Sequence, residues 1–290
     1  MPLIEFSAER PFGVELYPIF DKGFQLVTGK STSEWAFTEG VTPFSTYTEV
    51  ILSCIIYYAV IFGGQHALKY LPTYKPSSLK FPFQVHNLLL TIASGSLLAL
   101  LVEQVFPKVY NNGLMFAICS PDAWDYKVEI LYYLNYLCKY WELLDTVFLV
   151  LKHKKLEFLH YYHHSMTMAL CFTQLVGKTS VSWVPIILNL SVHVLMYYYY
   201  FRTASGAKIW WKKYLTTLQI TQFIIDLVAV YFCTYTYYAF TYFPFMPNKG
   251  SCTGEAVAAF FGCGLLSSYL VLFVKFYNNT YKKARSLKRE

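Results

Sequence analysis

Charged residues are scarce in this sequence. Asp, Glu, Lys and Arg make up 14% of its 290 residues, whereas 56% are hydrophobic and 20% are aromatic. Soluble domains carry about a quarter charged residues, so the composition argues against a soluble fold and indicates a membrane protein. The net charge of +7 does not indicate nucleic-acid binding, because the basic residues gather at the ends of apolar runs, where membrane proteins carry orientation signals.

Two metal-binding patterns are also missing. The seven cysteines contain no CxxC pair and no zinc-ligand spacing. The seven histidines are fewer than membrane di-iron desaturases and hydroxylases use, although this sequence shares their HxxHH box. A single ion held by the imidazoles is an alternative, but we expect no bound metal.

The N-terminal region lacks the apolar core of a cleavable signal peptide. Residues 1–45 contain Pro2, Pro11, Pro18 and scattered acids. We expect them to form a polar lumenal lead, which can include a surface-lying segment. Because no linker of low complexity interrupts the rest, residues 46–277 are expected to form one domain, followed by a basic cytosolic tail at 278–290.

Long apolar runs are abundant instead. A membrane-spanning helix needs about 20 mostly apolar residues. Pro82 and Pro107 are expected in connections, and Pro185 lies near enough to a helix start to be tolerated there. The predicted spans are residues 46–68, 85–105, 128–151, 158–176, 181–201, 215–238 and 256–277.

The distribution of Lys and Arg predicts the orientation of these spans. Sixteen basic residues lie in the connections after the first, third and fifth spans and in the tail, whereas seven lie on the opposite side. The positive-inside rule places the richer side in the cytosol. We therefore predict a lumenal N-terminus and a cytosolic C-terminus.

Four consecutive predicted spans carry polar side chains at helical spacing. Residues three and four positions apart share one helix face, and charged groups inside a membrane are costly. If the bundle turns these stripes inward, it forms a polar chamber open to the cytosol. The stripes consist of Lys139, Glu142, Asp145 and Thr146, then His160, His163 and His164, then His193, then Gln219, Gln222 and Asp226.

Each stripe also has a purely structural interpretation. Lys139 and Glu142 can form an ion pair that locks two helical turns. His193 can be a hydrogen-bonded interior group, and the two glutamines can join neighbouring helices. Three histidines on one intramembrane face are harder to explain in this way and favour a function. The remaining histidines lie near predicted helix ends and are assigned no role: His66, His86 and His153.

An imidazole without a metal can act as a base or nucleophile toward an acyl group. His163 can attack a thioester and hold the chain as an acyl-imidazole, which a membrane chamber protects from water. A Cys/His nucleophile that uses Cys171 is a secondary alternative. A seven-helix receptor or a transporter shares the predicted topology, but a receptor does not require polar stripes at one depth and a transporter performs no chemistry.

The polar motifs resemble those of the fatty-acid elongase (ELO) family of membrane 3-ketoacyl-CoA synthases. The resemblance is clear from about residue 126 to 226, and the motifs stand in the family's order. They are Lys139-x-x-Glu142-x-x-Asp145-Thr146, His160-x-x-His163-His164, His193-Val194-x-Met196-Tyr197 and Thr216-x-x-Gln219-x-x-Gln222-Phe223. The resemblance implies an all-α membrane protein with seven transmembrane helices, in which helices two to seven ring a narrow acyl tunnel.

The resemblance also implies a reaction, in which a long-chain acyl-CoA condenses with malonyl-CoA to give a 3-ketoacyl-CoA, CO2 and CoA. We expect His163 to be the acyl-accepting nucleophile or base, and His193 to assist decarboxylation or polarise a carbonyl. Which histidine carries the acyl chain stays open. The remaining expected roles are orientation and proton sharing for His160 and His164, support of the polar core for Lys139, Glu142, Asp145 and Thr146, and bonds to the substrate or the histidines for Gln219 and Gln222.

The expected ligands are the two substrates, with no cofactor. Cytosolic basic residues can meet the CoA phosphates, and the tunnel can bury the acyl tail at roughly 0.8 kcal/mol per CH2. The resemblance further implies residence in the endoplasmic reticulum membrane and cooperation with the reductases and dehydratase of the elongation cycle. A homodimer is compatible with it.

Cys119 and Cys252 are expected to form a disulfide. The charge distribution places both in lumenal connections, where disulfides are permitted, and the other five cysteines lie within predicted spans. If helices two to seven close a ring, these two connections must approach one another. Two unpaired thiols in apolar packing are the alternative.

Overall fold

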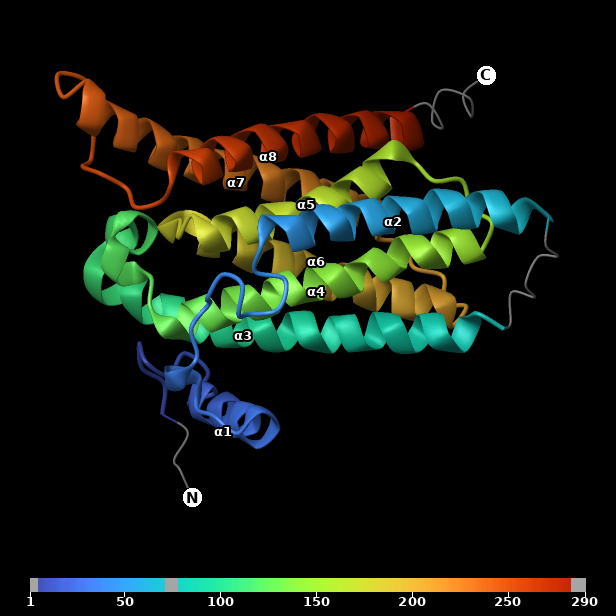
Figure 1. Ribbon diagram of the computed structural model, residues 1–290, viewed down its shortest axis with the longest axis horizontal. Coiled ribbons are helices and arrows are strands. Elements are labelled where there is room, and N and C mark those ends of the chain that lie inside the picture. Colours follow the sequence, from blue (N-terminus) through green and yellow to red (C-terminus); the bar gives the residue numbers. More distant parts are fainter. Residues whose placement is uncertain (1–4, 71–77, 283–290) are drawn as a thin grey trace.

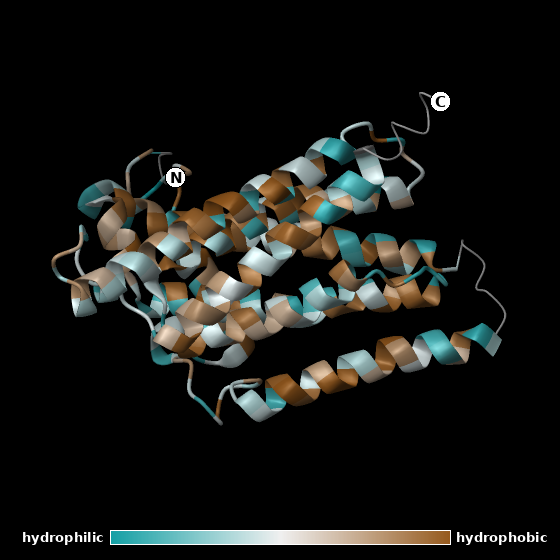
Figure 2. Ribbon diagram, turned by 90° about the horizontal axis from the view of Figure 1, so that it is seen from above, coloured by the Kyte–Doolittle hydropathy of each residue, from teal (hydrophilic) through white to brown (hydrophobic). Residues whose placement is uncertain are grey.

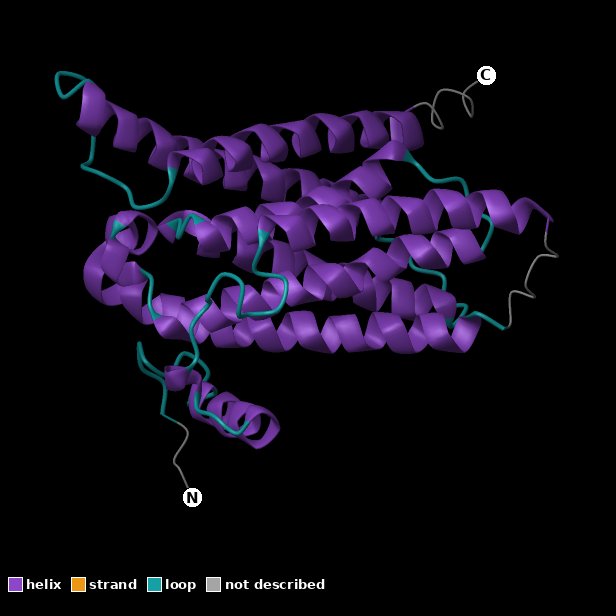
Figure 3. Ribbon diagram, viewed as in Figure 1, coloured by secondary structure: helices purple, strands orange, loops and turns teal. Residues whose placement is uncertain are grey.

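The computed structural model describes residues 5–70 and 78–282, and all regular structure in this part of the chain is helical (Figure 3). Residues 283–290 of the predicted basic tail lie outside the described residues. The long helices are α1 (Tyr17–Thr28), α2 (Tyr47–Ala67), α3 (Lys80–Cys119), α4 (Tyr126–Leu151), α5 (Phe158–Val176), α6 (Trp183–Ala204), α7 (Lys212–Tyr242) and α8 (Ala256–Tyr277). The short helical elements are the 3-10 helices η1 (Thr32–Glu34), η2 (Leu68–Tyr70), η3 (Pro121–Ala123) and η4 (Ser180–Ser182) and the π-helix η5 (Asn278–Lys282).

Each of the seven predicted spans corresponds to one of the helices α2 to α8. Five of these, α2, α3, α6, α7 and α8, are long and apolar enough to cross a membrane. Helices α4 and α5 carry the charged and histidine stripes, which lower their hydropathy. The chain thus has transmembrane character, while the crossing of all seven segments stays a prediction. Hydrophobic residues cover most of the middle of the bundle, and hydrophilic ones gather toward its ends (Figure 2).

Helices α3 to α8 pack on one another in a closed order. Helix α3 contacts α4 and α6, α4 contacts α5, α5 contacts α8, and α7 lies between α8 and α6. Helix α2 packs on α4 and α5 from outside this ring. The α3–α4, α5–α6 and α7–α8 connections lie at one end of the bundle, and the α4–α5 and α6–α7 connections lie at the other (Figure 1).

The predicted bounds of the second span were wrong at both ends. Helix α3 begins at Lys80, so Pro82 lies in its first turn, where a missing backbone N–H removes no helical bond. Pro107, expected in a connection, lies inside the helix, which continues to Cys119. The backbone leaves helical geometry only at Gly113, with φ 83° and ψ 164°, a conformation that a residue without Cβ adopts readily.

The N-terminal lead contains helix α1, which docks on α3. The buried carboxylate of Glu103 accepts hydrogen bonds from the backbone N–H groups of Leu16, at 2.5 Å, and Tyr17, at 2.8 Å. The first N–H groups of a helix lack partners and carry partial positive charge, so a carboxylate stabilises them. Asp21 accepts hydrogen bonds from the hydroxyl and the backbone N–H of Thr32. These two bonds lower the pKa of Asp21 and connect α1 to the segment that follows it.

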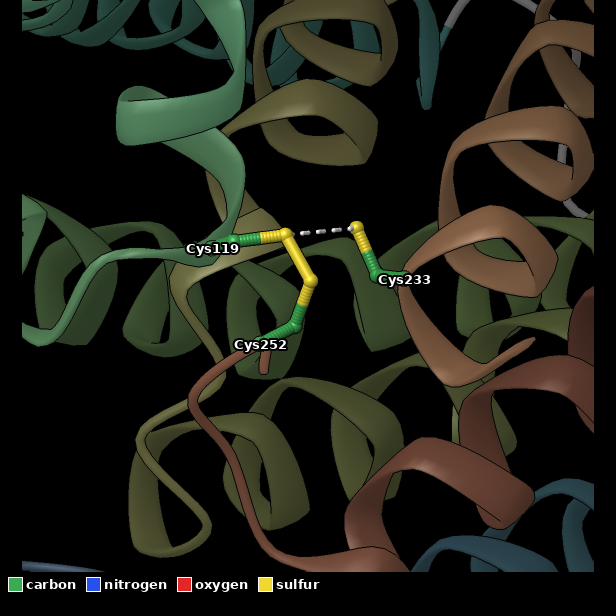
Figure 4. A group of neighbouring side chains, drawn as sticks. All are labelled: Cys119, Cys233 and Cys252. Carbon is green, nitrogen blue, oxygen red and sulfur yellow. Dashed lines mark hydrogen bonds between the residues drawn. A yellow bond between two sulfur atoms is a disulfide. The ribbon is translucent and has the colours of Figure 1, made fainter. Parts of the chain in front are cut away.

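The structure contains the expected disulfide between Cys119 and Cys252 (Figure 4). Cys119 is the last residue of α3 rather than a connection residue, and its Cα lies 3.9 Å from that of Cys252 in the α7–α8 connection. The backbone N–H of Thr253 also donates to the carbonyl of Cys119 at 2.9 Å. Because the bond spans 133 residues, the chain-entropy model gives it roughly 4 to 5 kcal/mol of stabilisation.

Candidate functional site

Two cavities inside the helix ring meet at a shared waist. The histidine cavity is lined by the predicted histidines and by Lys155 and Lys212 at the end of the bundle that holds the α4–α5 and α6–α7 connections. The apolar cavity is lined largely by apolar side chains such as Leu170, Leu175 and Leu266. Four residues line both cavities and form the waist: His163, Asn189, Gln222 and Phe223.

A buried ion pair anchors the wall of this site. Nζ of Lys139 lies 2.8 Å from Oε1 of Glu142, and the two residues are 2% and 3% exposed. Lys139 also donates to Oδ1 of Asn189 on α6 at 2.8 Å. The predicted charged stripe of α4 therefore does more than lock two turns of its own helix, since it binds the neighbouring helix at the waist.

This contact fixes the proton positions on His193. Lysine only donates hydrogen bonds, so the atom of Asn189 that faces Lys139 must be the oxygen. The amide nitrogen of Asn189 then donates to Nε2 of His193, at 3.2 Å. With Nε2 accepting, Nδ1 carries the proton of the neutral ring and donates to Oε1 of Glu142, at 3.2 Å. His193 is thus held from both sides by its neighbours.

Asp145 joins α4 to both α6 and α3. Its Oδ2 accepts from the hydroxyl of Tyr197 at 2.8 Å, and its Oδ1 lies 2.7 Å from Nε2 of His86. Trp141 donates to Nδ1 of His86, so Nε2 carries the ring proton and donates to Asp145. His86, which was assigned no role, is therefore a buried member of the polar network. The prediction failed because the expected start at residue 85 placed it at a helix end.

The three histidines of α5 differ in their surroundings. His163 is half-buried at the waist, where its ring centroid lies 4.8 Å from that of Tyr269 and 5.7 Å from that of Phe273. Within the described residues, no hydrogen bond engages its ring nitrogens. The rings of His160 and His164 lie 4.7 Å apart. Nε2 of His160 and Nδ1 of His164 are buried without a protein partner in the described part of the chain. The box thus offers free imidazole nitrogens beside the histidine cavity.

The glutamines and Thr146 occupy different positions. Gln219 lines the histidine cavity and donates to the sulfur of Met196 at 3.6 Å. Gln222 lies at the waist and donates to Asp226 at 3.2 Å. Across residues 5–70 and 78–282, neither amide bonds to a histidine. Thr146 turns away from the cavities and bonds Tyr57 of α2 at 2.7 Å, so it ties α2 to α4.

Cys171 lines the apolar cavity, where its sulfur accepts from the amide nitrogen of Asn135 at 3.7 Å. No hydrogen bond joins it to a histidine in the described chain. The structure therefore gives the Cys/His alternative no geometric support.

One cluster in the described residues has metal-ligand geometry, and it is not the histidine box. The sulfurs of Cys119, Cys233 and Cys252 lie within 4.8 Å of one another. Two of them are joined in the disulfide, with the sulfur of Cys233 3.9 Å from that of Cys119 (Figure 4). Metals bind thiolates, which a disulfide does not offer.

Comparison with known proteins agrees with the motifs. A family model described as "ELO: GNS1/SUR4 family" matches residues 42–289. The chain is 50% identical over 284 residues to putative fatty acid elongase 1 of Schizosaccharomyces pombe, covering 98% of this chain and 84% of that protein. It is 45% identical over 260 residues to putative fatty acid elongase 2 of the same yeast, covering 90% of this chain and 70% of that protein. It is 35% identical over 253 residues to fatty acid elongase A of Dictyostelium discoideum, covering 86% of this chain and 89% of that protein.

Proposed function

This chain belongs to the ELO, GNS1/SUR4 family, and from that premise we propose that it catalyses the condensing step of fatty-acid elongation. In this step a long-chain acyl-CoA and malonyl-CoA give a 3-ketoacyl-CoA, CO2 and CoA. The names of its relatives support fatty-acid elongation as the broader activity. The position of His163 supports the specific reaction.

The single observation that carries the proposal is the place of His163 between two unlike cavities. A thioester has an apolar tail and a large charged head, so its carbonyl belongs where an apolar cavity meets a polar one. His163 lies at that meeting point, and its nitrogens are free of hydrogen bonds in the described chain. The tail would gain roughly 0.8 kcal/mol per buried CH2, while Lys155 and Lys212 would meet the CoA phosphates.

The first half-reaction is transfer of the acyl group to His163. A ring nitrogen attacks the thioester carbonyl, the C–S bond breaks, and CoA leaves as the thiol after taking the ring proton, by way of His160 or His164. The product is an acyl-imidazole. The buried waist protects this species from hydrolysis.

The second half-reaction uses malonyl-CoA. Loss of CO2 leaves an enolate, whose carbon attacks the acyl-imidazole carbonyl. The C–N bond to His163 breaks, and the leaving ring nitrogen takes up a proton from water by way of His160 or His164. Asn189 uses one amide hydrogen for His193, so its second is available to the developing oxyanion. Glu142 and Asn189 hold the ring of His193 in a fixed position, so that it can assist decarboxylation.

The finer architecture belongs to the same proposal. We propose that all seven helices α2 to α8 span the endoplasmic reticulum membrane, with the histidine cavity open to the cytosol and the lead in the lumen. The joined cavities would form the acyl tunnel within the ring of α3 to α8. The 3-ketoacyl-CoA product requires reduction, dehydration and a second reduction, so the chain would work beside enzymes of those classes.

The test is an assay of the purified protein in detergent with a long-chain acyl-CoA and malonyl-CoA labelled at its free carboxyl group. We expect labelled CO2 together with a 3-ketoacyl-CoA longer by two carbons, identified by mass spectrometry. CO2 release without the longer product, or movement of acyl-CoA across vesicles without reaction, would overturn the proposal.

A further inference from the structure

A third cavity lies beyond the apolar cavity, toward the α7–α8 connection. This terminal cavity is lined by residues that include Tyr237, Tyr238 and the disulfide residue Cys252. It shares four lining residues with the apolar cavity: Gln174, Val181, Val230 and Gly262. We call these four residues the partition, because each of them lines both cavities.

Gln174 is the polar residue of the partition, and both the nitrogen and the oxygen of its side-chain amide are hydrogen-bonded. Nε2 of Gln174 donates to the carbonyl of Ala258 on α8 at 2.9 Å, and Oε1 accepts from the hydroxyl of Thr179 at 2.6 Å. The oxygen of Thr179 then lies 2.5 Å from the hydroxyl of Ser182, which must donate because the Thr179 proton is already used. A chain of hydrogen bonds therefore crosses from the α5–α6 connection to α8.

We propose that Gln174 sets the longest acyl chain that this protein accepts. This inference rests on the proposed function, since it places the acyl tail in the apolar cavity. The methyl end of the tail stops against the Gln174 amide, and the terminal cavity is closed to it. Because the amide is already paired with protein groups, it acts as a wall. An apolar tail that displaced it would leave buried polar atoms unpaired, which is costly.

The energetics favour a sharp limit. One methylene too many in a closed apolar pocket reduces the specificity constant by about tenfold or more. An acyl-CoA one two-carbon step beyond the limit should therefore be a much poorer substrate. Removing the amide should join the two cavities and move this limit to longer chains.

The experiment compares variants on a ladder of saturated acyl-CoAs that differ by two carbons, with product lengths read by mass spectrometry. For Gln174→Ala we expect the steep fall in kcat/KM to move to a longer substrate by at least one step, a gain of about tenfold or more on the first substrate that the native protein rejects. Gln174→Leu keeps most of the bulk but loses the hydrogen bonds, so its limit should move less than that of Gln174→Ala.

A second substitution tests the geometry of the wall. A Cβ at Gly262 would stand 3.6 Å from Nε2 of Gln174, in ordinary contact and facing the space that the amide fills. Adding Gly262→Ala to Gln174→Ala should therefore narrow the opened passage and return the limit toward the native length. Gly264→Ala is the matched control, because nothing lies within 4 Å of its Cβ position and Gly264 lines none of the three cavities.

The outcomes separate this inference from the proposed function. If the native protein extends acyl chains and folded Gln174→Ala keeps the same limit, the inference is overturned. If Gln174→Ala does not fold, Val230→Ala opens the same partition from α7, and an unchanged limit in that variant overturns it equally. If the native protein extends no acyl-CoA at all, both the proposed function and this inference are overturned.

Discussion

Nδ1 of His193 lies 3.2 Å from Oε1 of Glu142, the same oxygen that pairs with Nζ of Lys139. One carboxylate oxygen thus serves both a buried cation on its own helix and an imidazole on α6. The charged motif of α4 and the histidine of α6 therefore behave as one unit, whose stability and chemistry can be tested separately.

Breaking the buried pair from one side should destabilise the fold. Lys139→Met leaves Glu142 as an uncompensated buried charge, which costs about 3–5 kcal/mol of unfolding free energy. We expect a clear fall in the thermal unfolding midpoint in detergent. Lys22→Met, at an exposed lysine of α1, is the control and should change stability by about 0.5 kcal/mol or less.

The matching double variant separates stability from activity. Lys139→Met with Glu142→Leu removes both charges and should recover most of the lost stability. Its turnover should stay low, because His193 no longer has a carboxylate to hold its Nδ1 proton. Additive destabilisation in the double variant would show that the two groups do not form a coupled pair.

His163→Ala should abolish condensation while the protein stays folded. The ring lies near the rings of Phe223, Tyr269 and Phe273, and no hydrogen bond in the described chain engages its nitrogens, so its loss removes the nucleophile with little structural cost. Turnover by mass spectrometry and the unfolding midpoint measure the two effects. His66→Ala changes an exposed histidine of α2 that lines none of the three cavities and should keep native turnover. Near-native turnover of His163→Ala would show that His163 is not the nucleophile.

The orientation can be tested with glycosylation. Asn278-Asn279-Thr280 matches an acceptor sequence, but the proposed topology places it in the cytosol, so a glycosidase should not shift the protein on a gel. Lys30→Asn creates an acceptor, followed by Ser31 and Thr32, in the proposed lumenal lead. That variant should gain a glycan. A glycan on Asn278, or none in the Lys30→Asn variant, would contradict the orientation.

The sequence alone predicted the features that depend on residues of a single helix. Examples are the spacing of His160, His163 and His164 and the apolar length of the helices, which can be read without knowing any neighbouring helix. Asn189 could have been singled out, because it precedes His193 by one helical turn and so shares its face. Its importance comes from Lys139, a contact between helices that spacing within one helix does not reveal.

Two other features were missed for physical reasons. Pro107 was interpreted as a helix breaker, yet α3 continues through it and leaves helical geometry at Gly113, where the absence of a Cβ permits a positive φ. Helix α1 falls below the length of a membrane span. Leu16, Phe20 and Phe24, spaced by four residues, pack on the core, and this spacing is typical of an amphipathic helix.

The disulfide offers a last test of the geometry around Cys119. Mass mapping of unreduced protein should find Cys119 linked to Cys252, with Cys233 as a free thiol. In Cys252→Ser the nearest remaining thiol is that of Cys233, whose sulfur lies 3.9 Å from that of Cys119. Under an oxidant such as oxidised glutathione, we expect a Cys119–Cys233 bond in this variant.

The replacement bond should not restore native stability. It would tie α3 to α7 directly and release the α7–α8 connection, which the native bond holds against the end of α3. We therefore expect a lower unfolding midpoint in Cys252→Ser, whereas Cys233→Ser should keep the native bond and a native midpoint. Adding Cys233→Ser to Cys252→Ser should abolish the new crosslink. A free Cys119 thiol in oxidised Cys252→Ser would show that Cys233 cannot reach it.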